Sequence, residues 1–261
     1  MSVSTIKSPS SEVIQELGTV LLNIGIALMS SGASTSRTRM IVDRVATHYG
    51  MEADLFITHS VLTITVSDPV NELQFSRLKR TPPQGVNFTL VSDISRMTWR
   101  LKENNWTVAQ VEEELKRLKA LPHYPRIIVL FAVGFADACF CYFSGGNYSA
   151  MGVAMFATIA GLYIKQESFK LEFNQYLCVF FAALLATLLA GLFRSTFPEE
   201  GYSAAFASCV LFLIPGVPLI NTVTDLFEGN LLNGLIRATH AMLIAFMIAL
   251  GMTISILIYH F

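Results

Sequence analysis

The residues best placed to do chemistry lie in the segment Leu213–Asp225, which is apolar, is interrupted by Pro215, Gly216 and Pro218, and ends in polar side chains. Proline has no backbone N–H, so carbonyls about one turn earlier lose their helical partners and become available to a cation or an ammonium group. Within a bilayer such a break must be shielded by protein or line a cavity. Broken helices beside polar residues are typical of the elements with which transporters hold a solute.

Polar residues follow this break at once: Asn221, Thr222 and Asp225. We predict that they form part of a substrate pathway, together with carbonyls freed near Leu211 and Ile214. A helix that starts near the second proline would also direct its N-terminal amides at a carboxylate. The alternative is a proline kink that neighbouring helices pack, with no chemical role.

Asp137 lies midway through another apolar run, where an ionised carboxylate is costly unless it is paired, hydrated or protonated. It is a candidate proton or substrate-ammonium site, and the alternative is a neutral carboxyl hydrogen-bonded to a neighbouring helix. Asp225, Glu228 and Arg237 lie near the connection between the last two apolar runs, where surface solvation is the simplest explanation. A structural ion pair to Arg237 is favoured there over direct ligation of a solute.

The composition divides the chain into two regions. Its 261 residues are 53% hydrophobic and only 14% charged, which is too apolar for a typical soluble domain. Of the Asp, Glu, Lys and Arg residues, 26 lie in residues 1–126 and 11 in residues 127–261. We therefore expect a membrane protein with an N-terminal soluble α+β domain, residues 1–120, and a transmembrane domain, residues 121–261. The net charge of −1 argues against nucleic acid as a partner.

The N-terminal region shows alternating helix and strand patterns. The predicted helices are 11–30, a second helix capped near residues 34–36 and ending at Tyr49, then 93–102 and 107–120; the predicted strands are 53–58, 61–66 and 85–91. Met40 and Ile41 are placed on the buried stripe of the second helix. The turn Gly32–Arg37 precedes a helix N-terminus with free amides, so it is a candidate ligand or contact loop; an ordinary capping turn is the favoured alternative.

The C-terminal region carries five apolar runs near the length of about twenty residues that crosses a bilayer. The predicted transmembrane helices cover about 126–143, 147–165, 175–193, 202–221 and 234–259. With the N-terminus in the cytoplasm, seven of the eight basic residues that flank these runs are cytoplasmic and only Arg194 is outside, as the positive-inside rule requires. An odd number of spans then places Phe261 in the periplasm.

Sequence motifs of catalysis and metal binding are missing from the chain. It has no phosphate-binding glycine loop, no His-Glu-x-x-His and no nucleophile elbow, and His59 and Ser60 would point to opposite faces of a strand. The four cysteines fall inside apolar runs without a cluster that could complete a metal site, so we expect small buried apolar residues. We predict no catalytic residues, no metal and no cofactor.

Three groups of residues together resemble the threonine/serine exporter family. They are Gly32–Arg37 after a helix, Phe140 through Gly145 and Gly146, and Pro215–Asn221 followed by Asp225, Gly229, Gly234 and Arg237. The resemblance covers nearly the whole chain and is closest to the split form, in which a subunit with five spans pairs with a separate four-span subunit. It implies export driven by the proton-motive force, of threonine and serine by fused members and of dicarboxylates such as succinate by split members.

Structural or contact roles are expected for Gly32, Ser34, Arg37, Gly229, Gly234 and Arg237. Family members usually carry a small or neutral residue where Asp137 stands, so a proton-coupling role there would be particular to this chain. A partner is expected because a solute pathway is commonly lined by two repeats, whereas only one proline-broken segment is visible. That partner is a four-span subunit or a second copy, with Ala182, Ala186 and Ala190 as a candidate contact unless they pack within the chain.

The hypothesis from the sequence is therefore a subunit of a secondary exporter of small polar metabolites in the bacterial inner membrane, with lipid and a small-molecule substrate as partners. A non-transporting membrane-anchored sensor or scaffold is the main alternative, and a membrane-bound hydrolase is a weaker one.

Topology gives the first prediction. A periplasm-active reporter fused after Phe261 is expected to be active, and a cytoplasm-active reporter at the same position silent, because the basic flanks hold the N-terminus inside. Both reporters fused at the N-terminus serve as the control and should give the opposite pattern. Cytoplasmic activity at Phe261 would contradict the predicted orientation.

Overall fold

The chain forms two compact units in a computed structural model that describes residues 9–58, 60–70, 72–82, 85–122, 124–197 and 201–260. The first unit comprises Met1–Pro122 and Val217–Ala238, and the second comprises His123–Gly216 and Thr239–Phe261. Met1–Pro122, the first of the two segments of the N-terminal unit, ends close to residue 120, where the sequence predicts the domain boundary. Residues 217–238 differ from expectation, because they group with the N-terminal unit although the sequence analysis assigned them to the transmembrane domain.

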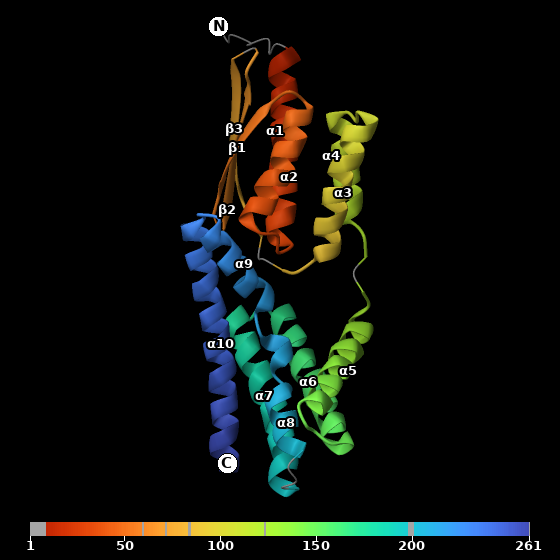
Figure 1. The fold of residues 1–261 in the computed structure, drawn as a ribbon, viewed down its shortest axis with the longest axis vertical. Coiled ribbons are helices and arrows are strands. Elements are labelled where there is room, and N and C mark those ends of the chain that lie inside the picture. The colour runs from red at the N-terminus through yellow and green to blue at the C-terminus, as the bar shows by residue number, and fades with distance from the viewer. Residues whose placement is uncertain are drawn as a thin grey trace. The chain divides into compact units, whose positions relative to one another are not determined.

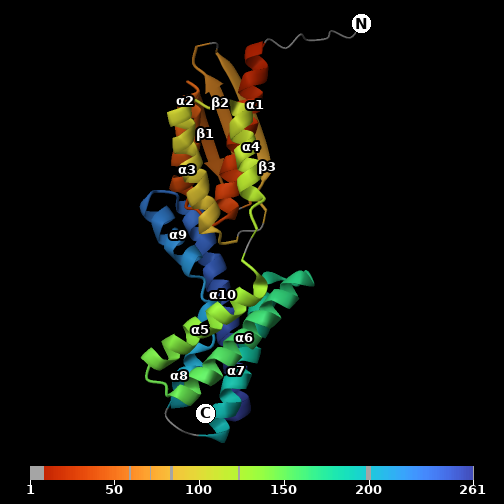
Figure 2. The same cartoon turned by 90° about the vertical axis from the view of Figure 1, so that its right-hand side faces the viewer.

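The N-terminal unit contains four helices and one sheet before the chain enters the second unit. They are α1 (Pro9–Ser30), α2 (Thr35–His48), β1 (Glu52–Ile57), β2 (Val61–Asp68), β3 (Leu73–Arg80), α3 (Phe88–Asn104) and α4 (Val108–Lys119). To these the unit adds nearly all of α9 (Gly216–Phe227) and the start of α10 (Leu231–Tyr259). In Figures 1 and 2 the sheet and the α3–α4 pair lie on opposite sides of α1 and α2.

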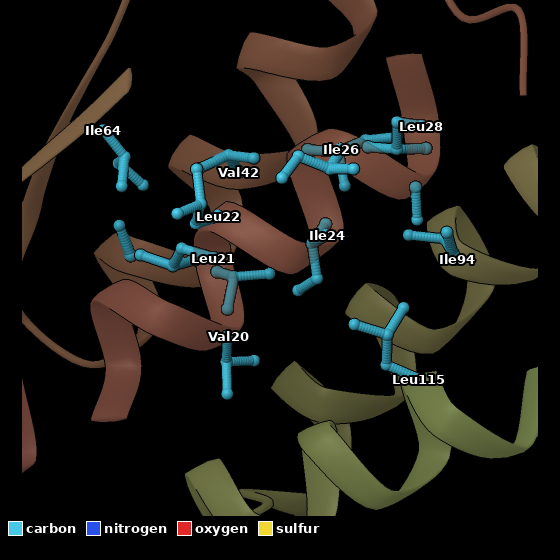
Figure 3. Packing of buried hydrophobic residues seen from close by; sticks show 14 of the residues in the cluster. Val20, Leu21, Leu22, Ile24, Ile26, Leu28, Val42, Ile64, Ile94 and Leu115 are labelled. Atoms are coloured by element: carbon cyan, nitrogen blue, oxygen red, sulfur yellow. The ribbon is translucent and has the colours of Figure 1, made fainter. Parts of the chain in front are cut away.

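Helix α1 is the centre of this unit because it carries apolar residues on nearly every side. Leu21, Leu22, Ile24 and Leu28 are all fully buried, and Figure 3 shows them among side chains from α2, β2, α3 and α4. By length and composition Ser11–Ser30 would also pass as a membrane span, but 67% of it is buried inside the protein. A helix that is apolar all round is a buried helix, and here the surrounding layers of the unit bury it.

The sheet is antiparallel in the order β1-β2-β3, and the two predicted strands at 53–58 and 61–66 are confirmed. Alternation along β2 turns Leu62, Ile64 and Val66 inward. The predicted strand 85–91 is wrong, because the Asn87 side chain accepts a hydrogen bond from the Leu90 N–H and caps α3 instead. The third strand is β3, a largely exposed edge strand whose basic residues hid its pattern.

Capping residues set several helix ends as predicted. Ser34 caps α2, and Thr107 with Gln110 forms the capping box of α4. The predicted helix 93–102 is part of the longer α3. Met40, expected on the buried stripe of α2, is 57% exposed, so that prediction is wrong, whereas Ile41 is buried.

The second unit is helical and contains α5 (Arg126–Phe143), α6 (Tyr148–Lys170), α7 (Gln175–Thr196), α8 (Gly201–Ser208), the short η1 (Leu211–Leu213) and most of α10. Over the described residues, five helices are long and apolar enough to cross a membrane: α1, α5, α6, α7 and α10. A broken pair, Tyr202–Leu213 with Gly216–Phe227, meets the same criterion as one further span. The five predicted spans thus correspond to four continuous helices and this broken pair.

Small residues let the helices of this unit approach closely. Ala182, Ala186 and Ala190 on α7 are fully buried, and a Cβ on Gly161 of α6 would lie 3.0 Å from both the Ala182 carbonyl oxygen and the Ala186 Cβ. The alanine row therefore packs within the chain, and its alternative role as a partner contact is wrong. Three cysteines, Cys141, Cys178 and Cys209, are buried as expected, whereas Cys139 is exposed.

Two glycines of α6 test this packing. Gly161→Ala is expected to lower the free energy of unfolding by about 1–3 kcal/mol, because the added methyl group overpacks the α6–α7 contact. Gly152→Ala, on the same helix with open space around it, should be neutral or stabilise by up to about 1 kcal/mol through helix propensity. Thermal unfolding of the full chain in detergent measures both, and equal effects of the two substitutions would contradict the packing described.

Candidate functional site

Several of the predicted site residues fall into two clusters, one in each unit. The α2-turn cluster, in the N-terminal unit, consists of the turn 32–36 with Asn221, Asp225, Asn233 and Arg237. The Asp137 cluster, in the helical unit, consists of Asp137, Thr158, Ser208 and the carbonyl of Cys209.

The turn at the start of α2 depends on Gly32 and Ser34. Gly32 has a φ of +89°, a left-handed conformation that favours glycine, and a Cβ there would lie 3.2 Å from the Gly85 carbonyl oxygen. The Ser34 side chain accepts a hydrogen bond from the Arg37 N–H at 3.3 Å and so caps α2. The Arg37 side chain is exposed, so only its backbone takes part in this turn.

One face of α9 contacts this turn. Asn221, Asp225 and Glu228 follow at spacings of four and three, which places them on the same side of a helix. Asn221 Nδ2 donates to the Gly32 carbonyl at 2.9 Å, the Thr35 N–H donates to Asp225 Oδ1 at 3.2 Å, and Ser36 Oγ donates to Glu228 Oε1 at 3.0 Å. The polar face of α9 is therefore directed at protein, which explains why residues 217–238 belong to the N-terminal unit.

Helix α10 completes the cluster with Asn233 and Arg237, one turn apart. Arg237 Nε lies 3.4 Å from Asp225 Oδ2, and its Nη2 donates to the Ala33 carbonyl at 3.2 Å. The side chains of Arg237 and Asp225 are 4% and 0% exposed, so this is a buried ion pair, and surface solvation, the simplest explanation from the sequence, does not hold for these two residues. Asn233, which the sequence analysis missed, donates through Nδ2 to the Ile57 carbonyl at 2.8 Å and to Thr35 Oγ1 at 3.3 Å. The sequence contains one indication of Asn233, because it is an amide side chain within an apolar run, four residues before Arg237.

Glycines shape the connection between α9 and α10. Gly229 has a φ of +81° in the turn between them, and a Cβ on Gly234 would lie 2.8 Å from the Leu226 side chain. Gly229 thus permits the reversal of the chain and Gly234 the close packing of the two helices.

The helix break itself leaves fewer free carbonyls than predicted. The Ile214 N–H donates to the Leu211 carbonyl at 3.1 Å, and the Gly216 N–H donates to the Ile214 carbonyl at 2.9 Å, so both carbonyls expected to be free have partners. Pro218 lies in the first turn of α9, where a missing N–H costs little, and Pro215 precedes that helix. Thr222 donates to the Pro218 carbonyl at 2.8 Å within α9.

The Asp137 cluster joins α5, α6 and α8 inside the helical unit. Asp137 is 6% exposed, and Thr158 and Ser208 are buried as well. Thr158 Oγ1 donates to Asp137 Oδ2 at 2.8 Å, and Ser208 Oγ approaches the same oxygen at 3.4 Å. Asp137 Oδ1 has no hydrogen-bond partner. Because Thr158 Oγ1 also lies 3.3 Å from the Cys209 carbonyl, beyond the end of α8, the cluster reaches the start of the interrupted segment.

A metal centre finds no support in the described part of the chain, where no three His, Cys, Asp or Glu side chains gather. The two clusters offer buried carboxyl groups, hydroxyl groups, amides and the guanidinium of Arg237.

Comparison with known proteins decides the family. The sequence profile of the ThrE family, described as "Putative threonine/serine exporter", matches residues 19–259. The chain belongs to this family. As a member of the exporter family it is a multi-pass membrane protein, in keeping with the five candidate spans.

Two curated relatives of this exporter family are similar to the chain along most of its length. The protein named "Probable succinate transporter subunit YjjP" from Klebsiella aerogenes is 26% identical over 237 residues, which cover 90% of each chain. The protein of the same name from Escherichia coli K12 is 26% identical over 241 residues, covering 91% of this chain and 93% of the relative. No solved structure matches the chain significantly.

The buried ion pair yields a stability prediction for this exporter. Asp225→Ala is expected to lower the free energy of unfolding by about 3–5 kcal/mol, because Arg237 is then left as an uncompensated buried charge. Glu228→Ala removes a more exposed contact on the same face of α9 and should cost about 1 kcal/mol or less. Thermal unfolding of the full chain in detergent compares the two.

A double variant checks the physical cause. Replacing both partners, as in Asp225→Leu with Arg237→Met, should be less destabilising than Asp225→Ala alone, because no unpaired charge remains. Losses that simply add would show that Asp225 and Arg237 do not compensate each other.

Proposed function

We propose that the chain is one subunit of a secondary exporter that moves small polar metabolites across the bacterial inner membrane, and that it is a transporter and not an enzyme. Threonine and serine, or dicarboxylates such as succinate, are the candidate solutes. Support comes from the family, from the relatives named as succinate transporter subunits, and from the apolar helices of the second unit.

The observation that carries this proposal is the Asp137 cluster. A buried carboxyl group among apolar helices is costly, and such residues commonly mark proton or substrate pathways. Both hydroxyl donors converge on Oδ2, which leaves Oδ1 as the oxygen able to take up a proton or to meet a solute donor. Asp137 would then couple solute export to proton entry by gaining a proton from one side of the membrane and releasing it on the other.

The position of the cluster supports a role in the pathway. Ser208 is the last residue of α8 and Cys209 follows it, so the hydroxyl donors and the carboxyl group meet at the first interruption of the segment that runs into η1 and the prolines. Discontinuous membrane helices place polar groups beside solutes in many transporters. A purely structural cluster in a membrane-anchored scaffold is the competing interpretation, and it assigns Asp137 no titration during function.

A partner subunit is part of the proposal. The chain offers one interrupted segment, whereas transport pathways commonly lie between two repeats. The relatives are named as subunits, which supports a complex. A four-span membrane subunit is the expected partner, with a second copy of the chain as the alternative. The orientation is the one that the basic flanks favour, with the N-terminus in the cytoplasm.

Asp137→Asn separates a coupling role from a structural one. In proteoliposomes that contain the chain with its partner, the variant should lose gradient-driven transport by at least about a hundredfold, a loss typical for removal of an essential proton-transfer group. It should retain solute exchange without a gradient, because the amide keeps the hydrogen bond from Thr158 but cannot take up a proton. Labelled threonine, serine and succinate report both activities.

Cys139→Ala, an exposed substitution on the same helix, is the matched control and should transport normally. If Asp137→Asn retains full gradient-driven transport, Asp137 does not couple. If it loses exchange together with gradient-driven transport while remaining inserted, its role is in the structure or in binding and the coupling assignment fails.

A further inference from the structure

We propose that the turn at the start of α2 is a carboxylate-binding site that Asp225 fills as an internal ligand, and that a carboxylate of the transported solute exchanges with it. This inference rests on the proposed function, because it names where on the chain an exported carboxylate would bind. All the residues involved belong to the N-terminal unit.

The N-terminus of α2 supplies the first half of this site. Free amides at a helix N-terminus attract anions, and acidic side chains in the first turn often provide the negative charge. The first turn of α2 has no acidic residue. The negative charge at this helix N-terminus comes instead from Asp225, which is 190 residues away from Thr35 in sequence and accepts a hydrogen bond from the Thr35 N–H at 3.2 Å. The turn thus already binds a carboxylate, and the chain itself provides it.

Arg237 supplies the second half, and Asp225 satisfies it only in part. Arginine and carboxylate groups often form two parallel hydrogen bonds with lengths of about 2.7–2.9 Å. Here Asp225 Oδ1 is taken by Thr35, and Oδ2 lies 3.4 Å from Arg237 Nε. Arg237 Nη2 donates to the Ala33 carbonyl, while Nη1 has no hydrogen-bond partner although the side chain is only 4% exposed. Arg237 therefore keeps an N–H group that can donate to a second carboxylate, or to one that lies closer to the guanidinium than Asp225 does.

Neighbouring atoms show the same incomplete pairing. Asp225 Oδ2 and Asn233 Oδ1 are buried and have no hydrogen-bond partner. Asn233 stands one turn before Arg237 and is held through its other atom by Ile57 and Thr35. Buried polar groups are normally paired, so a donor and two acceptors left together need an explanation. These unpaired atoms are explained if the site binds Asp225 at one time and a solute carboxylate at another, because such a site cannot match the geometry of Asp225 alone.

Exchange at this site would act on α9. When a solute carboxylate takes the Thr35 amide and Arg237, Asp225 is displaced, and α9 keeps only its contacts from Asn221 and Glu228 to the turn. Binding would therefore loosen the helix that follows the proline-broken segment. A ligand shifts a conformational equilibrium only through a difference in affinity, and competition with Asp225 provides that difference.

Calorimetric titration of the full chain in detergent tests the exchange. The probes are succinate and L-threonine, with uncharged succinamide as the chemical control. Wild type should bind at least one carboxylate and not succinamide. Asp225→Asn removes the competing charge but can still accept the Thr35 N–H, so it should bind the carboxylate at least about tenfold more tightly. Arg237→Lys should weaken binding at least about tenfold, and Asp54→Asn, an exposed carboxylate of the same unit, should bind as wild type does.

The sign of the Asp225→Asn effect protects the test from misfolding, since a damaged protein would not bind more tightly. Unchanged or weaker binding by this variant would overturn the proposal. The proposal would also be overturned if Asp225→Asn bound the carboxylate and wild type did not, because the substitution itself would then have created the binding site. Failure of this site appears in the binding of carboxylates by Asp225→Asn and Arg237→Lys, whereas failure of the coupling role appears in gradient-driven transport by Asp137→Asn, so the two remain distinguishable.

Discussion

The carboxylate of Asp225 holds together three segments that are far apart in the sequence. It accepts the first amide of α2, faces Arg237 of α10 and extends from α9, all without exposure to water. A buried charge persists only where other groups compensate it, so these three elements cannot separate without leaving a charge unpaired. The consequence is visible in the polarity of α9, which directs Asn221, Asp225 and Glu228 at the protein while Ile220 and Val223 are exposed.

In the helical unit, too, buried polar groups need partners, and small side chains and hydroxyl groups provide the contacts between the helices. Small residues bring helices into contact, as at Gly161 and Ala186, and hydroxyl groups pair across the contact, as Thr187 does with Ser255 at 2.7 Å. Tyr259 donates to the Leu188 carbonyl at 2.9 Å in the same way. Against this background Asp137 stands out, since one oxygen of its carboxyl group is paired and the other is not. A residue that must change its protonation state during transport would have such incomplete pairing.

Local patterns in the sequence were enough to predict most of the helices. Ser34 and Thr107 marked helix starts because capping is a short-range interaction, and long apolar runs marked α5, α6, α7 and α10. Strand β3 was missed because an exposed edge strand has little apolar alternation, and residues 85–91 were misread because Asn87 gave a weak capping signal. A pairing of Asp225 with Arg237 was one explanation that their proximity in the chain left open, but its burial was not predicted. The contact of Asn221 and Asp225 with the turn after α1 joins residues about 190 positions apart, which no periodicity encodes.

The central claim is that this chain forms part of a proton-coupled exporter, and co-reconstitution tests it most directly. The chain is placed in lipid vesicles alone and together with the proposed four-span partner, a pH gradient is imposed, and uptake of labelled threonine, serine and succinate is measured. Saturable uptake of at least one solute is expected, and it should require the gradient and the partner together. If the correctly inserted complex moves none of the three solutes under the gradient, or moves them equally well without it, the chain is not part of a proton-coupled exporter of these solutes.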